Sequence, residues 1–283
     1  YIENKRRYQR SEIDPNNKLS IYREVENDGI IYFTDHGIYK LEYVVSDFNG
    51  NISRLPIHVR AFPFTDPAGQ PPPADAVLFS MDKLNEFKTD DISIELPGAS
   101  LYRDLWFEYN SSPMPEGAFS RVHHIHNKYI PLHKYFNLSI LPDSLPEQKD
   151  KLLLASIDEE GNYSFSGGKW EDGTLNARIR SFGDYVVLID TVPPVISSVN
   201  IASGIIKPDR KTVRVKIEDK ESGISKYMAS LNGEWLLMEY DAKNNLLIYY
   251  IDERLKKGEN DLRIEVTDGK ENVKVFKKLL FRQ

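Results

Sequence analysis

The fold is decided by Gly37-Ile-Tyr-Lys-Leu-Glu-Tyr-Val-Val-Ser-Asp-Phe-Asn-Gly-Asn51. The same pattern returns in Gly258-Glu-Asn-Asp-Leu-Arg-Ile-Glu-Val-Thr-Asp-Gly-Lys-Glu-Asn272, at a constant offset of 221 residues. Both stretches carry an alternating apolar run that ends at an Asp, and an Asn follows four residues after that Asp. A strand of this kind, an Asp-opened turn and a returning strand form the last hairpin of an immunoglobulin-like sandwich. The repeat therefore predicts two related β domains.

Alternation of apolar and polar residues also dominates outside the repeat. Residues 92–96 and 212–217 place an apolar side chain at every second position. This period of two buries one face of a sheet and exposes the other. Helical periodicity is confined to three short candidates, Met81–Phe87, Leu145–Lys151 and Asp252–Lys257. We therefore predict an all-β chain of three tandem β-sandwich, immunoglobulin-like domains.

Two proline-rich stretches divide the chain. The first is Phe62–Pro73, and the second is Asp190-Thr-Val-Pro-Pro-Val-Ile196. Proline has no N–H to donate to a sheet, so such stretches connect domains. We expect the C-terminal part of an immunoglobulin-like domain at 1–62, a linker at 63–73, a middle β-sandwich at 74–190 and a C-terminal immunoglobulin-like domain at 191–283. The first has room for only four or five strands, so we expect its beginning before Tyr1; a small complete sheet is the alternative.

Composition narrows the classes of function. The 283 residues carry a formal net charge of −6 and no basic run, which argues against a nucleic-acid partner. No apolar stretch approaches the roughly 18 residues of a membrane-spanning helix. The chain has no cysteine, so disulfides, thiolate nucleophiles and Cys-bound metals are excluded. It starts at Tyr1 and shows no leader, so we expect either a removed signal peptide or a piece of a longer protein.

Histidines are the one type of candidate functional residue that is concentrated in a short stretch of the sequence. Four of the six lie between His123 and His133. On a strand, His124 and His126 point to the same face, which is a spacing that suits two ligands of one zinc, with His133 as a third. No carboxylate is placed beside them as a general base, so a partly buried strand that happens to be rich in histidine is the competing interpretation.

Aromatic and acidic residues offer weaker candidates. Trp106, Trp170 and Tyr102 could stack on sugar rings, although alternation assigns part of this aromatic set to the core. Adjacent carboxylates such as Glu159-Glu160 fall in expected turns and suit solvated loops better than glycoside hydrolysis. The Asp47–Asn51 turn could hold calcium, but a turn closed by the Asp side chain fits it better.

A resemblance to a known family rests on short motifs at turns and strand ends. They include Asp47-Phe-Asn-Gly-Asn-Ile-Ser53, Ala177-Arg-Ile-Arg-Ser-Phe-Gly183 and Asp190-Thr-Val-Pro-Pro194. They resemble the β region that follows the catalytic domain in M23 (LytM-type) envelope metallopeptidases of Bacteroidetes. That family binds zinc through His-x3-Asp and a later His-x-His. Only His124-x-His126 fits the second motif and nothing fits the first, so no catalytic residue is carried over.

The resemblance implies a non-catalytic accessory region of a cell-envelope zinc peptidase. It would act as a spacer or contact peptidoglycan or another envelope glycan, and its first partner would be its own upstream catalytic domain. Zinc is then expected upstream and no cofactor is expected in this chain, which would reside in the periplasm or be secreted. One alternative is a free-standing carbohydrate-binding or adhesion module. A second is a hydrolase with zinc at the His123–His133 cluster, so whether the chain is itself an enzyme stays open.

Overall fold

The computed structural model describes residues 12–20, 22–31, 33, 35–61 and 75–283. Its regular structure is β-strand, with two short 3-10 turns and no α-helix among these residues. The all-β prediction is confirmed. The helix candidates are wrong: Met81–Phe87 becomes a turn leading into a strand, Asp252–Lys257 is a turn, and Leu145–Lys151 contributes only the 3-10 turn Lys149–Lys151. The predicted linker at 63–73 lies outside the described residues.

The first segment contains one hairpin among its described residues. Strand β1 (Gly37–Ser46) pairs antiparallel with β2 (Ile52–Ala61), and a 3-10 turn spans Asn27–Gly29. The side chains of Tyr43 and Val45 are 42% and 66% exposed, whereas their repeat counterparts Ile264 and Val266 are fully buried. The repeated sequence thus forms the same hairpin twice, but only the second hairpin has its apolar face covered by the residues described.

The middle segment is a sandwich of two five-stranded sheets, with orders β11-β10-β14-β8-β7 and β12-β13-β9-β5-β4, and a separate β3-β6 pair. Its strands are β3 (Val77–Phe79), β4 (Asn85–Lys88), β5 (Ile92–Leu96), β6 (Leu105–Phe107), β7 (Tyr109–Ser112), β8 (Val122–Ile125), β9 (Pro131–Ile140), β10 (Leu152–Ile157), β11 (Tyr163–Phe165), β12 (Lys169–Glu171), β13 (Thr174–Ser181) and β14 (Gly183–Ile189). Phe136, Leu138 and Val187 are fully buried between the sheets. The alternation predicted for 92–96 is confirmed, because Ile92, Ile94 and Leu96 all face this core.

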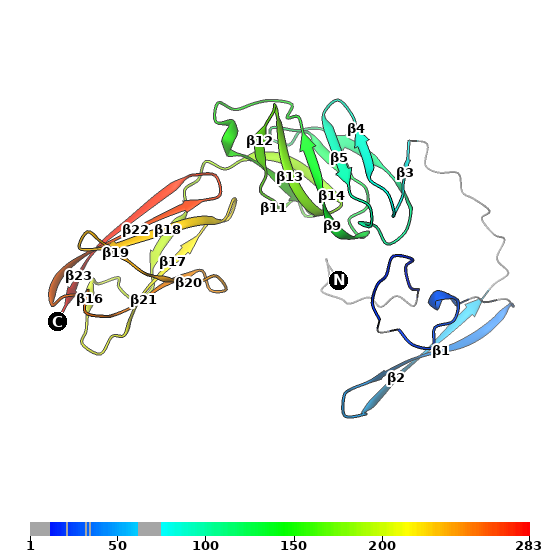
Figure 1. Cartoon of the computed structure of the whole chain (residues 1–283), viewed down its shortest axis with the longest axis horizontal. Helices are drawn as coiled ribbons and strands as arrows, with labels where there is room; N and C mark the ends of the chain where they lie inside the picture. The colour runs from blue at the N-terminus through cyan, green and yellow to red at the C-terminus, as the bar shows by residue number, and fades with distance from the viewer. Residues whose placement is uncertain (1–11, 21, 32, 34, 62–74) are drawn as a thin grey trace.

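The C-terminal segment is a second sandwich with sheet orders β15-β17-β21-β20 and β16-β23-β22-β18-β19. Its strands are β15 (Val195–Ser198), β16 (Ile205–Ile206), β17 (Thr212–Glu218), β18 (Ile224–Leu231), β19 (Glu234–Leu236), β20 (Glu239–Asp241), β21 (Leu246–Tyr250), β22 (Gly258–Asp268) and β23 (Val273–Arg282). Val213, Val215, Ile217 and Ile264 build a core separate from that of the middle sandwich. Figure 1 shows the two sandwiches as distinct bodies joined where β14 leads into β15.

The hairpin turns of the three segments share one construction. In each, one Asp oxygen accepts hydrogen bonds from backbone N–H groups two and four residues on, and the other accepts from the side chain of the Asn four residues on. The turns are Asp47–Asn51, Asp158–Asn162 and Asp268–Asn272. The Asp-closed turn predicted at Asp47 is confirmed. Only the third turn is buried, and it lies at the junction of the two sandwiches.

No helix in the described part of the chain is long and apolar enough to cross a membrane.

Candidate functional site

Three aspartates meet where the middle and C-terminal sandwiches join. Asp190 follows β14, Asp219 follows β17, and Asp268 is the last residue of β22. Each offers a carboxylate oxygen, and these oxygens lie within 4.8 Å of one another. Asp190 and Asp268 are fully buried, and Asp219 is partly buried. Strand ends that are far apart in sequence therefore build one acidic cluster, which we call the junction cluster.

Local hydrogen bonds orient each member of the junction cluster. Asp190 accepts from the backbone N–H of Val192 at 3.0 Å and from the hydroxyl of Ser222. One oxygen of Asp219 accepts from the N–H of Gly223 at 2.9 Å, which folds the following loop around the carboxylate. Asp268 is held by the Asp–Asn turn described above. Because these donors are backbone or side-chain dipoles, they fix the carboxylates without neutralising them.

The junction cluster forms no ion pair within 4.0 Å among the described residues. Lys270 is near enough to respond to Asp190 and Asp268, yet its ammonium donates to the backbone oxygen of Gly168 at 2.7 Å. Burial lowers the pKa of Lys270, and the two aspartates oppose that shift. The cluster therefore gathers negative charge without a directly paired cation.

A fourth carboxyl group, that of Glu221, borders the cluster. Its Oε2 atom is buried and has no hydrogen-bond partner among the described residues. Burial raises the pKa of Glu221 to about 7, and its contact with the Asp190 carboxyl adds to the shift. Burial likewise raises the pKa of Asp219, with Asp190 and Asp268 contributing. Two carboxyl groups in contact repel each other unless a proton or a cation lies between them.

The donor set of this site consists of oxygen atoms. Carboxylate oxygens are preferred by hard cations such as Ca²⁺ and Mg²⁺, whereas zinc sites in proteins usually include His or Cys. The arrangement suits binding of a hard divalent cation. This site is not among the sequence predictions. The available signal was that each Asp stands directly at the end of a strand or in the second proline-rich stretch.

The predicted zinc ligands each have other partners. The Nδ1 of His124 lies 2.8 Å from Asp184, and its Nε2 lies 2.9 Å from the Ser112 hydroxyl. His126 has a positive φ of 49° and accepts a hydrogen bond from the Glu108 N–H at 3.3 Å. His133 stacks on Tyr102 with ring centroids 4.0 Å apart. Among the described residues the ring nitrogens of the three histidines do not gather within 4.8 Å, and zinc at this cluster stays a prediction.

His123 lies outside that predicted ligand set and is fully buried. Its Nδ1 lies 2.9 Å from the Tyr109 hydroxyl, while its Nε2 has no partner among the described residues. Burial lowers the pKa of His123 to about 4. The ring is therefore held in its neutral form.

The predicted glycan-binding aromatics occupy three different environments. Trp106 on β6 is 45% exposed, and its strand partner is Leu78. Trp170 on β12 packs against the middle core, with the Lys149 ammonium 5.9 Å from its ring centroid. Tyr102 lies against His133. Glycan binding by these three residues stays a prediction.

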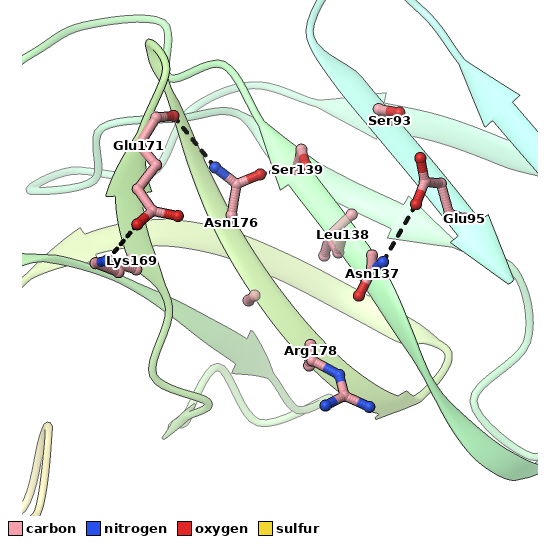
Figure 2. Close-up of a pocket in the computed structure, with 10 residues that line it drawn as sticks. Ser93, Glu95, Asn137, Leu138, Ser139, Lys169, Glu171, Asn176 and Arg178 are labelled. Atoms are coloured by element: carbon pink, nitrogen blue, oxygen red, sulfur yellow. Dashed lines mark hydrogen bonds and ion pairs between the residues drawn. The ribbon is translucent and has the colours of Figure 1, made fainter. Parts of the chain in front are cut away.

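A polar concavity of about 340 Å³ lies on the β12-β13-β9-β5-β4 sheet. Figure 2 shows its side chains rising from four neighbouring strands. The Asn137 amide donates to Glu95 at 3.2 Å, and the Ser139 hydroxyl donates to Asn176. Just beyond these side chains, the Arg178 guanidinium lies 5.8 Å from the ring centroid of the exposed Tyr135. The face thus offers amide, carboxylate and guanidinium groups beside an aromatic ring.

Comparison with known proteins bears on the middle segment. Residues 76–190 match the Zu5-like domain. One similar solved structure is entitled "PcdhgB3 EC1-4 in 50 mM HEPES"; it is 12% identical with a TM-score of 0.25, over 88% of this chain and 66% of that chain. No curated protein matches the chain.

The Zu5-like match ends at a member of the junction cluster. Asp190 is its last residue, whereas Asp219 and Asp268 lie in the following sandwich. The Zu5-like segment also supplies Lys151 and Gly168, whose groups bond to Asn272 and Lys270. The junction cluster is therefore shared between the Zu5-like segment and its neighbour.

Proposed function

We propose that the chain is a non-catalytic accessory region of an M23-like zinc peptidase of the bacterial cell envelope. Its role is to hold the upstream catalytic domain at a set distance and orientation from its wall target. The peptidase context comes from the sequence resemblance, while the spacer role is supported by how the two sandwiches are joined.

The observation that supports the spacer role is the set of hydrogen bonds between the two sandwiches at their junction. The Lys151 ammonium donates to the side-chain oxygen of Asn272, and the Asn272 amide donates to the backbone oxygen of Asp190 at 3.1 Å. Lys270 adds its bond to Gly168 from the same turn. Domains joined by a simple linker move relative to each other, unless contacts across the interface oppose the motion. These bonds restrain the angle between the two sandwiches.

Spin-label distances test the spacer role directly. Because the chain has no cysteine, Lys88→Cys and Lys277→Cys introduce one labelling site in each sandwich without background. Both side chains are exposed. A spacer gives one narrow distance distribution in the otherwise unchanged chain and a broad one after Asn272→Ala. A broad distribution in both proteins would reject the spacer role.

The peptidase context has a separate test. The reading frame that encodes Tyr1 is sequenced upstream, and a domain with His-x3-Asp and His-x-His is expected in the same frame. An open reading frame without such a domain would reject the peptidase context and leave the spacer measurement unaffected.

Contact with an envelope glycan is a second candidate, favoured by the polar concavity. Paired amide and carboxylate groups beside an aromatic ring suit the hydroxyls and faces of a sugar. Calorimetric titration with soluble peptidoglycan fragments is expected to give binding that Asn137→Ala and Asn176→Ala remove. Trp106→Ala serves as the matched test of the aromatic alternative, and binding lost only in that variant would place the glycan there instead.

A further inference from the structure

We infer that Ser112, His124 and Asp184 form a nucleophilic site that hydrolyses small carboxylic esters. This activity goes beyond the proposed accessory role and does not depend on it, because that role concerns the reaction of a zinc peptidase domain upstream. Three observations support it: two connected hydrogen bonds across neighbouring strands, the exposure of the groups that form them, and an amide beside the place where negative charge would develop.

The hydrogen bonds run across the middle sandwich from β7 to β14. The Ser112 hydroxyl lies 2.9 Å from Nε2 of His124, and Nδ1 of the same ring lies 2.8 Å from the Asp184 carboxylate. An ionised carboxylate only accepts hydrogen bonds, so it holds the ring proton on Nδ1 and leaves Nε2 free to accept the proton of Ser112. Nucleophile, base and orienting carboxylate are therefore connected in the order that activates a serine for acyl transfer.

Strand pairing holds these side chains on one face of a sheet. Strands β7, β8 and β14 are neighbours, and His124 pairs directly with Asp184 on one side and with Asn110 on the other. Directly paired side chains lie on the same face. Ser112 shares that face, because it follows Asn110 by two residues on the same strand. Groups placed on strands keep their mutual geometry better than groups on loops.

The neighbouring histidines have different contacts. His123 is fully buried and its Nδ1 contacts a tyrosine hydroxyl, His126 accepts from a backbone N–H, and His133 stacks on a tyrosine ring. Among the described residues, His124 alone of these four has a hydroxyl at one ring nitrogen and a carboxylate at the other. Its connection to Ser112 is thus not a general property of the histidine-rich stretch.

A substrate can reach the serine from solvent. The side chains of His124 and Asp184 are 31% and 44% exposed, and β7 is the outermost strand of its sheet among the residues described. Asn110 is exposed on the same face, so its amide can donate to the oxygen of an ester carbonyl as that oxygen becomes negative. This open setting suits a small acyl group such as acetyl.

The reaction proceeds in two balanced steps. Oγ of Ser112 attacks the ester carbonyl carbon while its proton passes to Nε2 of His124; the tetrahedral intermediate then expels the alcohol, which takes that proton, and the acyl group stays on Oγ. Water attacks this second ester and gives a proton to Nε2. When the intermediate collapses, the proton returns to Oγ and the carboxylic acid leaves. Asp184 stays ionised throughout and is a positioning residue.

Labelling of the full chain with a fluorophosphonate tests the nucleophile. The serine oxygen displaces fluoride from phosphorus, so intact mass and peptide mapping are expected to find one adduct, on Ser112. His124→Gln is expected to slow labelling by ~100-fold or more. The matched control is Ser156→Ala, which removes a hydroxyl of the same sheet that donates to a backbone oxygen, and it leaves labelling unchanged. No adduct on Ser112, or equal labelling after His124→Gln, would overturn the inference.

Hydrolysis of p-nitrophenyl acetate tests the turnover. The unchanged chain is expected to release p-nitrophenol over many turnovers, and Ser112→Ala to lower kcat by ~100-fold or more. Asn110→Ala is expected to lower kcat by ~tenfold or more, because one donor to the oxyanion is lost. Equal rates in the unchanged chain and Ser112→Ala, or labelling without turnover, would reject hydrolysis. If Ser112→Ala does not fold, the adduct and the turnover of the unchanged chain still decide.

The positioning role of Asp184 has its own readout. Asp184→Asn is expected to slow both labelling and hydrolysis by ~tenfold or more, because the ring of His124 loses its fixed tautomer. Asp184→Glu keeps a carboxylate and is expected to give rates between those of Asp184→Asn and the unchanged chain. A merely structural role would change the melting temperature without this order of rates, and equal rates in the two variants would overturn the positioning role.

Discussion

The side-chain amide of Asn272 donates a hydrogen bond of 3.1 Å to the backbone carbonyl of Asp190, its neighbour in space but 82 residues earlier in sequence. The same side chain accepts from Lys151 and donates to Asp268 at 2.8 Å. One residue thus closes its own turn, holds the connection between the sandwiches and engages the middle sandwich. Among the described residues, the side chains of its counterparts Asn51 and Asn162 donate only within their own exposed turns.

Replacing Asn272 is therefore expected to cost more than replacing its counterparts. Asn272→Ala leaves buried polar partners without their hydrogen bonds, which lowers the free energy of unfolding by ~1–3 kcal/mol. Asn162→Ala removes the same local bonds where water can replace them, and is expected to cost under ~1 kcal/mol. Urea denaturation followed by circular dichroism compares the two. Equal losses would mean that Asn272 acts only within its turn.

The two separate cores are expected to respond independently to large-to-small substitution. Phe136→Ala opens a cavity in the middle core and is expected to cost ~3–5 kcal/mol there. Ile264→Ala does the same in the C-terminal core, at ~2–5 kcal/mol. Differential scanning calorimetry should show each substitution lowering one transition while the other stays near its original temperature. A single transition lowered by both would show that the sandwiches unfold as one unit.

Acid is expected to destabilise the middle sandwich through His123. The pKa of this residue is lowered to about 4 by burial, from an ordinary value of 6.5. Between these values the unfolded chain binds a proton that the folded chain does not, so stability is full above pH 6.5 and falls as the pH drops toward 4. The loss from this residue approaches ~1.4 kcal/mol per pH unit at its steepest.

The measurement is urea denaturation at several pH values for the parent chain and for His123→Gln, which cannot titrate. The difference between their stabilities is expected to shrink or reverse on acidification. Parallel curves for the two proteins would show that His123 does not contribute to acid sensitivity.

Close packing of backbone at the junction makes Gly269 intolerant of a side chain. A Cβ atom there would lie 2.6 Å from the backbone oxygen of Ser222, whereas a Cβ at Gly37 would meet nothing nearer than 4.0 Å. Gly269→Ala is expected to cost ~1–3 kcal/mol by overpacking. Gly37→Ala is expected to be neutral or slightly stabilising, by up to ~1 kcal/mol, because it restricts the unfolded chain. Thermal unfolding monitored by circular dichroism distinguishes the two, and a neutral Gly269→Ala would refute the close approach.

Local patterns in the sequence were sufficient to predict strands and turns, but not the junction cluster. Alternation identified the buried residues of 92–96 and 212–217, since side chains on a strand point to opposite faces whatever the strand pairs with. The repeat identified the hairpin and its Asp–Asn turn. Asp190, Asp219 and Asp268 lie in three separate segments with no fixed spacing, so only the order of the strands brings them together. The histidines show the converse relation, because His124, His126 and His133 are close in sequence while their rings contact different partners.

Strand β14 is the last strand of the middle sandwich in sequence, yet it lies at the centre of its sheet, between β10 and β8. Tyr185 pairs there with both Ser156 and His123. Until β14 leaves the ribosome, β8 and β10 have no common neighbour, and the middle sandwich cannot close. Non-local pairing of this kind slows folding, because the chain entropy of a long loop is lost before its contacts form. The two halves of this sheet, β11-β10 and β8-β7, therefore remain separate until residues 183–189 have been synthesised. Their unpaired strand edges make the nascent chain prone to aggregation during that time.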